Sequence, residues 1–289
     1  MERFSYFLDK MKNLLVYPLY KIKGRGSEYE GHKLNLQKNI EIVEKFGCVD
    51  AIKVIGSEVD HWSEMVGDMI EKIYEFNTSG YNVLFSEIDT VFLQEFSEIF
   101  SLEKLTMFAR CNGASKIDPS LSAGYYLNAG LTYYPANLDS SIWELSRNKF
   151  KSDNSIAVAG TTYEVLVNRM FYSQFPDKNA GIDYIGKSIG FSKYNWRGLL
   201  SVDHSEMPSR VADIKHIHFL NMSQYIHNNK NFGKFWYNEF LHDLYIDTLS
   251  GNKTNKTIVS LLEYYVKSIN LNSVKKPKIE KYINLLRDS

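Results

Sequence analysis

The order of apolar and amphipathic runs in the first third of the chain constrains the fold more than any other feature of the sequence. Short apolar runs that predict β-strands occupy residues 13–20, 51–55 and 81–85. Between them, residues 32–46 and 62–76 carry apolar side chains at the spacing of amphipathic helices. This order predicts a parallel sheet with right-handed crossovers, in which ligands collect beyond the carboxyl ends of the strands.

The rest of the chain extends this prediction to a mixed α/β fold with a C-terminal appendage. Residues 161–172 predict a helix, and residues 187–211, which lack a clear period, predict loops. We therefore expect an α/β domain over residues 1–225 and a helical, basic extension over residues 226–289. Three further strands are predicted at residues 104–110, 124–134 and 214–220, and two helices of the extension at residues 234–249 and 257–269.

Charge and cysteine content exclude several classes of protein. The 289 residues include 34 basic and 34 acidic side chains, so the chain lacks the excess positive charge of a protein that coats nucleic acid. Two cysteines are too few for a disulfide framework or a four-thiolate zinc site. No segment approaches the ~18 consecutive apolar residues of a membrane span, and charged side chains interrupt the first apolar stretch. We therefore expect a cytoplasmic protein.

The charge balance conceals a basic C-terminal segment. Over residues 251–289, eight Lys and Arg stand against three acidic side chains, a net charge of +5, which leaves −5 on residues 1–250. Such a segment is typical either of a solvated basic helix or of a contact with a polyanion such as DNA. The abundance of Asn, Lys, Ile and Tyr also indicates an AT-rich genome, such as that of a virus or phage.

Two carboxylates follow the third predicted strand. Glu87 and Asp89 stand one residue apart, directly after the apolar run that ends at Phe85. In an extended chain alternate side chains point the same way, so both carboxylates would face one spot. Two carboxylates that close repel each other unless a cation lies between them, and Mg²⁺ or Mn²⁺ suits such a pair. Two exposed acids in a turn are the alternative interpretation.

The same segment resembles a family motif. Residues 82–96, NVLFSEIDTVFLQEF, resemble the D-x-D segment of GT-A type glycosyltransferases, in which a buried strand delivers two carboxylates that hold a metal on a nucleotide-sugar diphosphate. Asp89 matches the second acid, and Glu87 stands where the family usually has Asp. The resemblance implies a Rossmann-type mixed sheet flanked by helices and a glycosyltransferase that requires Mn²⁺ or Mg²⁺.

Two later segments resemble the family in the same order along the chain. The run YYLNAGLTYYP resembles the strand that lines the donor-sugar pocket with an Asn and small residues, here Asn128, Ala129 and Gly130. The run TYEVLVNRMF resembles a helix that carries an acidic residue and an Asn four positions on, here Glu164 and Asn168. The resemblance implies that Asn128 hydrogen-bonds the donor sugar.

A third later segment, IKHIHFLN, resembles the strand that supplies the third metal ligand of the family. His218 fits the family spacing best. His216 lies two residues away and faces the same side of an extended strand, so it is the second candidate.

The resemblance also implies the parts of a reaction. The donor would be a nucleotide sugar, with a UDP-sugar expected, and the metal held by Glu87, Asp89 and His218 would stabilise the leaving diphosphate. Glu164 would act as general base in an inverting enzyme or steady the oxocarbenium-like sugar in a retaining one, and we prefer the retaining alternative. The remaining donor-binding residues are expected at the ends of the first and third strands: Tyr17, Pro18, Tyr20 and Ser86.

Two other functions and several acceptors stay open. A sugar nucleotidyltransferase would use a Gly-rich phosphate loop after the first strand, for which Gly24, Arg25 and Gly26 are the candidates, although the full loop pattern is missing. A binding module that keeps the fold without catalysis is suggested by Glu87 in place of Asp. The acceptor could be a glycan, a protein side chain, a small molecule or a modified DNA base, which the basic segment would contact.

Overall fold

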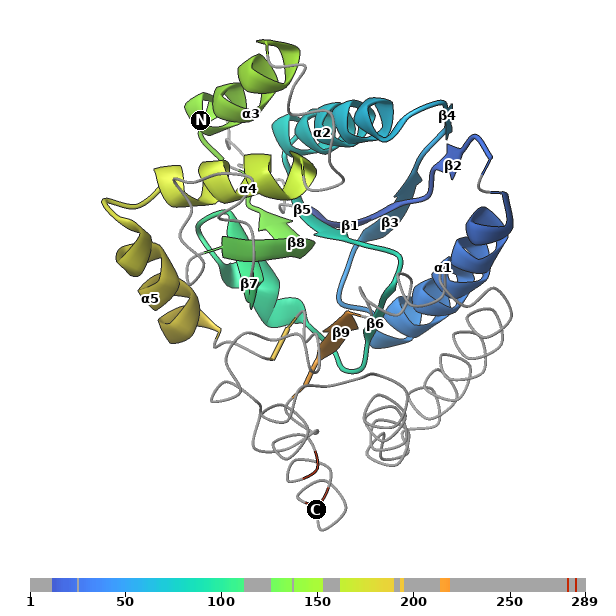
Figure 1. Ribbon diagram of the computed structural model, residues 1–289. Coiled ribbons are helices and arrows are strands. Elements are labelled where there is room, and N and C mark those ends of the chain that lie inside the picture. Colours follow the sequence, from blue (N-terminus) through green and yellow to red (C-terminus); the bar gives the residue numbers. More distant parts are fainter. Residues whose placement is uncertain are drawn as a thin grey trace, which may run out of the picture.

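A five-stranded sheet forms the centre of the described part of the chain (Figure 1). The computed structural model describes residues 12–24, 26–111, 126–136, 138–152, 162–189, 193–194, 214–218, 280 and 284. Strand β1 pairs in parallel with β3 and β5, whereas β8 runs antiparallel to both β5 and β7. The predicted mixed sheet with a parallel core is therefore confirmed. In spatial order the strands are β3 (Ala51–Ile55), β1 (Lys12–Pro18), β5 (Tyr81–Ser86), β8 (Tyr126–Tyr134) and β7 (Thr106–Cys111).

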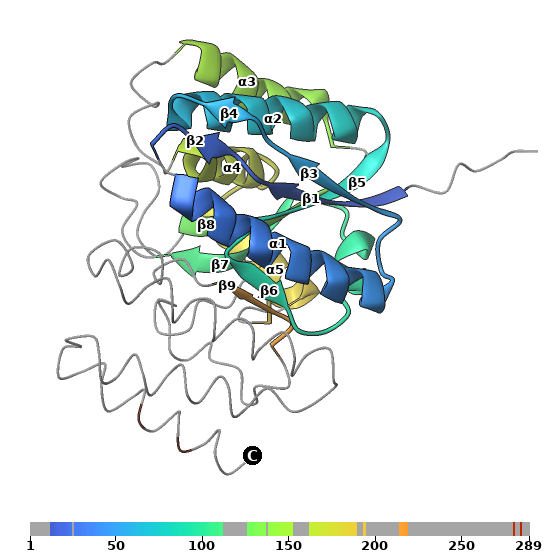
Figure 2. The ribbon, with the colours of Figure 1, turned by 90° about the vertical axis from the view of Figure 1, so that its right-hand side faces the viewer.

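Helices cover both faces of this sheet, as Figures 1 and 2 show. Helix α1 (Gly26–Phe46) lies on one face, and Gly47, with a φ of 62°, ends it in the left-handed region that favours glycine. The helices on the opposite face are α2 (Trp62–Thr78), α3 (Ser140–Ser152), α4 (Thr162–Ser173) and α5 (Lys178–Ser188).

The alternation of side chains along β1 explains why both faces are covered. Leu15 and Tyr17 are fully buried in the cluster of apolar side chains beneath α1, whereas Leu14 and Val16 are buried in the cluster on the face of α2 and α4. A strand that is apolar on both faces can be buried only between two layers of helix. The continuous apolar run of β1 thus requires the three-layer arrangement.

Two small strand pairs lie beside the main sheet. Strand β6 (Thr90–Phe92) pairs antiparallel with β9 (His216–His218), and β2 (Lys21–Ile22) pairs in parallel with β4 (Glu58–Val59). A short 3₁₀ helix, η1 (Ser97–Ser101), follows β6. The β6–β9 pair and η1 pack into the cluster on the α1 side, so they continue the core past the carboxyl end of β5.

Some predicted boundaries differ from the structure. The helix expected at residues 32–46 begins six residues earlier, and α5 extends to Ser188, so the prediction of a loop from residue 187 is wrong at that end. Helices α3 and α5 were not expected. The predicted extension over residues 226–289 and its two helices lie outside the described residues, apart from residues 280 and 284. Among the described residues, no helix combines the length and the apolar composition that crossing a membrane requires.

Candidate metal centre and donor site

A bend, not an extended strand, brings the two predicted carboxylates together. Residues 87–89 turn between the end of β5 and the start of β6. Ile88, between the two acids, packs against the core on the α1 side and anchors the bend. The expectation that an extended chain aligns Glu87 with Asp89 is therefore wrong in its reason, although both carboxylates reach the same place.

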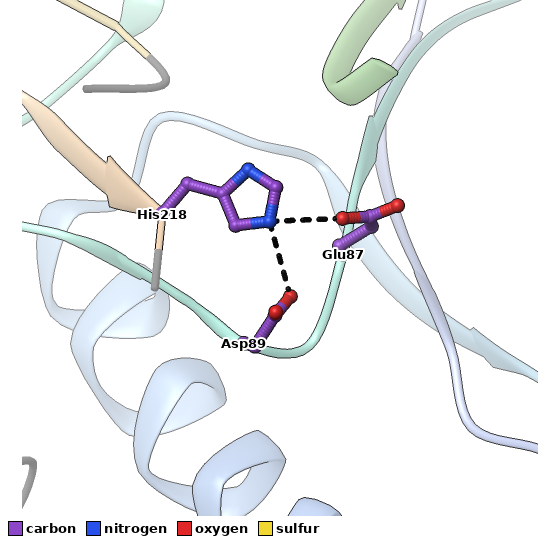
Figure 3. Close-up of side chains that lie close together, drawn as sticks. All are labelled: Glu87, Asp89 and His218. Carbon is purple, nitrogen blue, oxygen red and sulfur yellow. Dashed lines mark ion pairs between the residues drawn. The ribbon is translucent and has the colours of Figure 1, made fainter. Parts of the chain in front are cut away.

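The two carboxylates converge on the imidazole of His218 (Figure 3). His218 Nε2 lies 3.0 Å from Glu87 Oε2 and 3.4 Å from Asp89 Oδ1. One potential ligand atom from each residue lies within 4.8 Å of the other two. The His218 side chain is fully buried, whereas the Glu87 side chain is 32% exposed and that of Asp89 17%. The cluster is therefore closed on the imidazole side and open on the carboxylate side.

Electrostatics couple the three side chains. Burial alone would lower the pKa of His218, but the adjacent Asp89 and Glu87 carboxylates outweigh it and raise that pKa to about 9. Burial raises the pKa of Asp89, but the neighbouring His218 lowers it by more. The pKa of Asp89 therefore lies below its usual value. A single positive charge, on a proton or on a bound cation, is therefore strongly stabilised between these groups.

Hydrogen bonds from both sides fix the bend. Thr90 Oγ1 donates to the Glu87 carbonyl at 2.6 Å and lies 2.9 Å from Ser86 Oγ. The Glu87 N–H donates to the Gly130 carbonyl, and Asn39 Nδ2, from α1, donates to the Thr90 carbonyl at 2.6 Å. The sequence prediction missed Thr90 and Asn39. A Thr three residues after an acid is a local turn signal, so Thr90 could have been predicted. Asn39 contacts a residue 51 positions away, and no local sequence pattern indicates that contact.

His216 lies on the same short strand as His218 but outside the cluster. Its Nε2 is 3.3 Å from Ser86 Oγ, and its ring packs against Phe92 with the centroids 4.5 Å apart. Burial, followed by the neighbouring His218, lowers the pKa of His216 well below its usual value. The structure thus brings His218, and not His216, together with the two carboxylates.

The predicted donor-sugar strand, β8, runs directly behind His218. Asn128 Oδ1 lies 3.0 Å from His218 Nδ1 and accepts the Gly130 N–H at 3.0 Å. Glu164, from α4, accepts hydrogen bonds from Asn128 Nδ2 and from the Ala129 N–H. The structure therefore joins Glu164, the predicted catalytic carboxylate, to the cluster of Glu87, Asp89 and His218 through one amide side chain.

Asn168 connects α4 to the same strand one helical turn further on. Its amide accepts the Leu127 N–H at 2.9 Å and donates to the Leu127 carbonyl and to the Glu164 carbonyl at 2.7 Å. The predicted shared face of Glu164 and Asn168 is confirmed, and it is the face that packs on β8. The described hydrogen bonds of the fully buried Asn168 go to backbone.

The residues predicted to bind the nucleotide lie at the carboxyl end of β1, beside β5. Tyr17 is fully buried in the core on the α1 side, and Pro18 is the last residue of β1 and is also buried. Tyr20 is 8% exposed, and its hydroxyl donates to Asp68 Oδ2 at 2.8 Å. Carboxyl ends of neighbouring parallel strands meet at one edge of a sheet, so these residues share an edge with the cluster.

The fold and the cluster together resemble those of a known class of protein. A mostly parallel sheet, flanked by helices, with two carboxylates directly beyond a central strand is the Rossmann-like arrangement of GT-A proteins. Residues 50–190 match the model of the family described as nucleotide-diphospho-sugar transferase. The match confirms the resemblance predicted from the sequence and supports a glycosyltransferase-type activity.

The matched region extends from β3 through α5. It includes Glu87, Asp89, Asn128 and Glu164, whereas β1 and β9, and therefore His218, lie outside it. A comparison with curated proteins found no match.

Proposed function

We propose that this chain is a metal-dependent glycosyltransferase, which transfers a sugar from a nucleotide-diphosphate donor to an acceptor hydroxyl. One observation carries the proposal. Two carboxylates from the matched family region, Glu87 and Asp89, meet the imidazole of His218 at the ligand-binding edge of the sheet.

The chemistry of this donor set fits a divalent cation. Two carboxylate oxygens and one imidazole nitrogen face one another, and the open carboxylate side leaves room for water and phosphate oxygens as further ligands. Mg²⁺ prefers oxygen ligands, so the nitrogen of His218 favours Mn²⁺. Bound there, the ion would stabilise the charge that develops on the leaving nucleoside diphosphate.

The chain's own residues suggest how the donor lies. We place the diphosphate at Glu87 and Asp89 and the base, in a UDP-sugar, along the adjacent end of β1 near Tyr20. The donor sugar then lies toward β8, where Glu164 is held by hydrogen bonds from Asn128 and Ala129. A carboxylate fixed in this way would stabilise an oxocarbenium-like sugar, which agrees with a retaining reaction.

We place the reaction in the cytoplasm and retain as acceptors a glycan, a protein, a small molecule and a modified DNA base. The last would engage the basic segment at residues 251–289, whose net charge is +5.

Donor turnover tests the proposal. The full chain is incubated with a panel of nucleotide sugars in Mn²⁺, Mg²⁺ or a chelator, and nucleoside diphosphate release is measured for wild type, Asp89→Asn and Glu75→Gln. Glu75 is an exposed residue of α2 that pairs with Lys72, and it serves as the control carboxylate. We expect Asp89→Asn to lose about 100-fold or more, because a metal contributes several kcal/mol of charge stabilisation, and Glu75→Gln to keep full activity.

Two results would contradict the proposal. Turnover that is equal in Mn²⁺ and in chelator would show that no metal takes part. Release of pyrophosphate from a nucleoside triphosphate and a sugar phosphate, without release of nucleoside diphosphate from any nucleotide sugar, would assign the chain to the nucleotidyltransferases instead.

A further inference from the structure

We propose that Asn128 is a positioning residue that seats the imidazole of His218 with Nε2 directed at the two carboxylates. The inference deepens the proposed function and rests on it only for the role of His218 as a metal ligand. Three observations carry it: the fixed orientation of the Asn128 amide, the contact with Nδ1, and the space that Gly130 leaves for the ring.

The orientation of the Asn128 amide is determined by two neighbours. The Gly130 backbone N–H can only donate, so the atom that it meets at 3.0 Å must be the amide oxygen. The Glu164 carboxylate accepts, so the atom that faces it must be the amide nitrogen. Flipping the amide would break both hydrogen bonds at once.

This orientation fixes the state of one ring nitrogen of His218. Asn128 Oδ1 can only accept, and it lies 3.0 Å from His218 Nδ1 in a site where both residues are 3% exposed. Nδ1 must therefore carry a proton. In the neutral imidazole the lone pair is then on Nε2, the atom that faces Glu87 and Asp89.

Gly130 completes the seat. A Cβ at this position would overlap both Cε1 and Nδ1 of the His218 ring and would lie 2.8 Å from Asn128 Oδ1. Even an alanine would therefore push the ring away from the amide. The Asn-Ala-Gly run, which the resemblance assigns to the sugar pocket, also shapes the surface on which the imidazole rests.

The physical consequence is a ligand that is ordered before the ion arrives. Metal-ligating histidines commonly donate their other ring N–H to an oxygen, which sets the tautomer and the ring orientation, and loss of that partner typically costs about 10–100-fold in metal affinity. Asn128 supplies this oxygen from β8, and its other end is held by Glu164 on α4.

The test compares Asn128→Leu, Asn128→Asp and the control Thr132→Val in the full chain. Leucine has nearly the size of asparagine but no acceptor, whereas aspartate keeps an acceptor toward Nδ1 and loses the donor to Glu164. Thr132 is a buried residue of the same strand whose hydroxyl donates to the Ala129 carbonyl at 3.1 Å. Circular dichroism establishes that each variant is folded.

The first measurement needs no metal. In ¹⁵N-histidine-labelled, metal-free protein at neutral pH, nuclear magnetic resonance should detect a slowly exchanging Nδ1–H of His218 in wild type, Asn128→Asp and Thr132→Val. In Asn128→Leu this proton should exchange faster and its resonance should shift. A wild-type Nδ1 that carries no proton, or a proton that Asn128→Leu leaves unchanged, would overturn the proposal.

The second measurement is Mn²⁺ affinity in the presence of UDP. We expect about 10–100-fold weaker binding by Asn128→Leu, binding by Thr132→Val as tight as in wild type, and binding by Asn128→Asp tighter than by Asn128→Leu. Equal affinity in wild type and Asn128→Leu would overturn the proposal. If the protected Nδ1–H is present but wild type binds no Mn²⁺, the proposed function fails while the seating of His218 by Asn128 stands.

Discussion

The buried imidazole of His218 faces two partly exposed carboxylates, so a proton and a metal ion compete for one position. The carboxylates overcome burial and raise the pKa of His218 to about 9, above its unfolded value of about 6.5. In metal-free protein the stabilisation from this charge is therefore complete below about pH 6.5 and is lost as the pH rises toward 9. Metal binding must release the same proton.

This competition predicts a steep pH dependence of metal affinity. Between pH 6 and pH 8 the affinity for Mn²⁺ should rise by nearly tenfold per pH unit, because His218 must lose its proton to bind the ion. Titration calorimetry in two buffers of different ionisation enthalpy checks this and should show about one proton released per ion at pH 7. Affinity that stays constant from pH 6 to pH 8 would contradict the account.

Residue chemistry alone identified part of the site. Carboxylates after an apolar strand are a local pattern, and Glu87 and Asp89 could be predicted from it. The choice between His216 and His218 could not be predicted in this way, because residues two apart on an extended strand point to the same side. The structure separates them through Ser86 and Phe92, which occupy the surroundings of His216.

At the scale of elements, the Thr90 hydroxyl makes the shorter of two hydroxyl contacts to the Glu87 carbonyl in the bend between β5 and β6; the other is from Ser86 Oγ at 3.3 Å. Thr90 Oγ1 donates to the Glu87 carbonyl and contacts Ser86, and the residue is 1% exposed. Without that hydroxyl the Glu87 carbonyl loses a partner in a nearly buried setting. The position of both carboxylates should then loosen.

Thr90→Val should lower the free energy of unfolding by about 1–3 kcal/mol and also weaken Mn²⁺ binding. Thr106→Val is the matched control, because Thr106 is buried and its hydroxyl donates to the Lys104 carbonyl at 2.8 Å in β7. Denaturant unfolding and metal titration of both variants check the prediction. We expect a comparable loss of stability in the control with unchanged affinity, and equal affinities in the two variants would show that the bend does not depend on Thr90.

The elements themselves were predicted unevenly for a physical reason. Strands β1 and β5 are buried on both faces, so the apolar runs in their sequences predict them. Helix α3 was missed because much of its surface faces solvent, including Leu145, which is 47% exposed. Strand β6 could not be predicted because it exists only through its pairing with β9, more than a hundred residues away.

At the scale of the whole molecule, an ion-pair cluster of Glu98, Lys193 and Lys215 fixes the chain directly before β9, which we call the approach to β9. Glu98 in η1 bridges Lys215 at 2.6 Å and Lys193 at 2.9 Å. The backbone of Lys215 also accepts the Leu93 N–H and donates to the Lys193 carbonyl. Residues 93–98, Lys193 and Lys215 thus meet directly before the strand that carries His218.

This cluster predicts an acid sensitivity. Burial raises the pKa of Glu98, but hydrogen bonds from Lys215, Tyr194 and Lys193 outweigh it and lower the pKa to about 2. Because the folded-state pKa lies below the usual 4.5, the stabilisation is present above pH 4.5 and is lost as the pH falls toward 2. Urea unfolding of wild type and Glu98→Gln at pH 6 and pH 3 checks this.

Wild type should lose more stability than Glu98→Gln over that interval, since the variant has no carboxylate at residue 98 to protonate. Glu58→Gln provides a control, because Glu58 pairs with Lys21 at 2.9 Å on an exposed part of the surface where such pairs contribute little. An equal loss in wild type and Glu98→Gln would show that the cluster does not hold the approach to β9.

The central claim is that Glu87, Asp89 and His218 hold one divalent ion, and pulsed electron paramagnetic resonance of bound Mn²⁺ tests it most directly. With ¹⁵N-labelled histidine, wild type should show coupling of Mn²⁺ to one imidazole nitrogen. The coupling should persist in His216→Gln and vanish in His218→Gln. Bound Mn²⁺ without nitrogen coupling in wild type, or coupling that survives His218→Gln, would contradict the account.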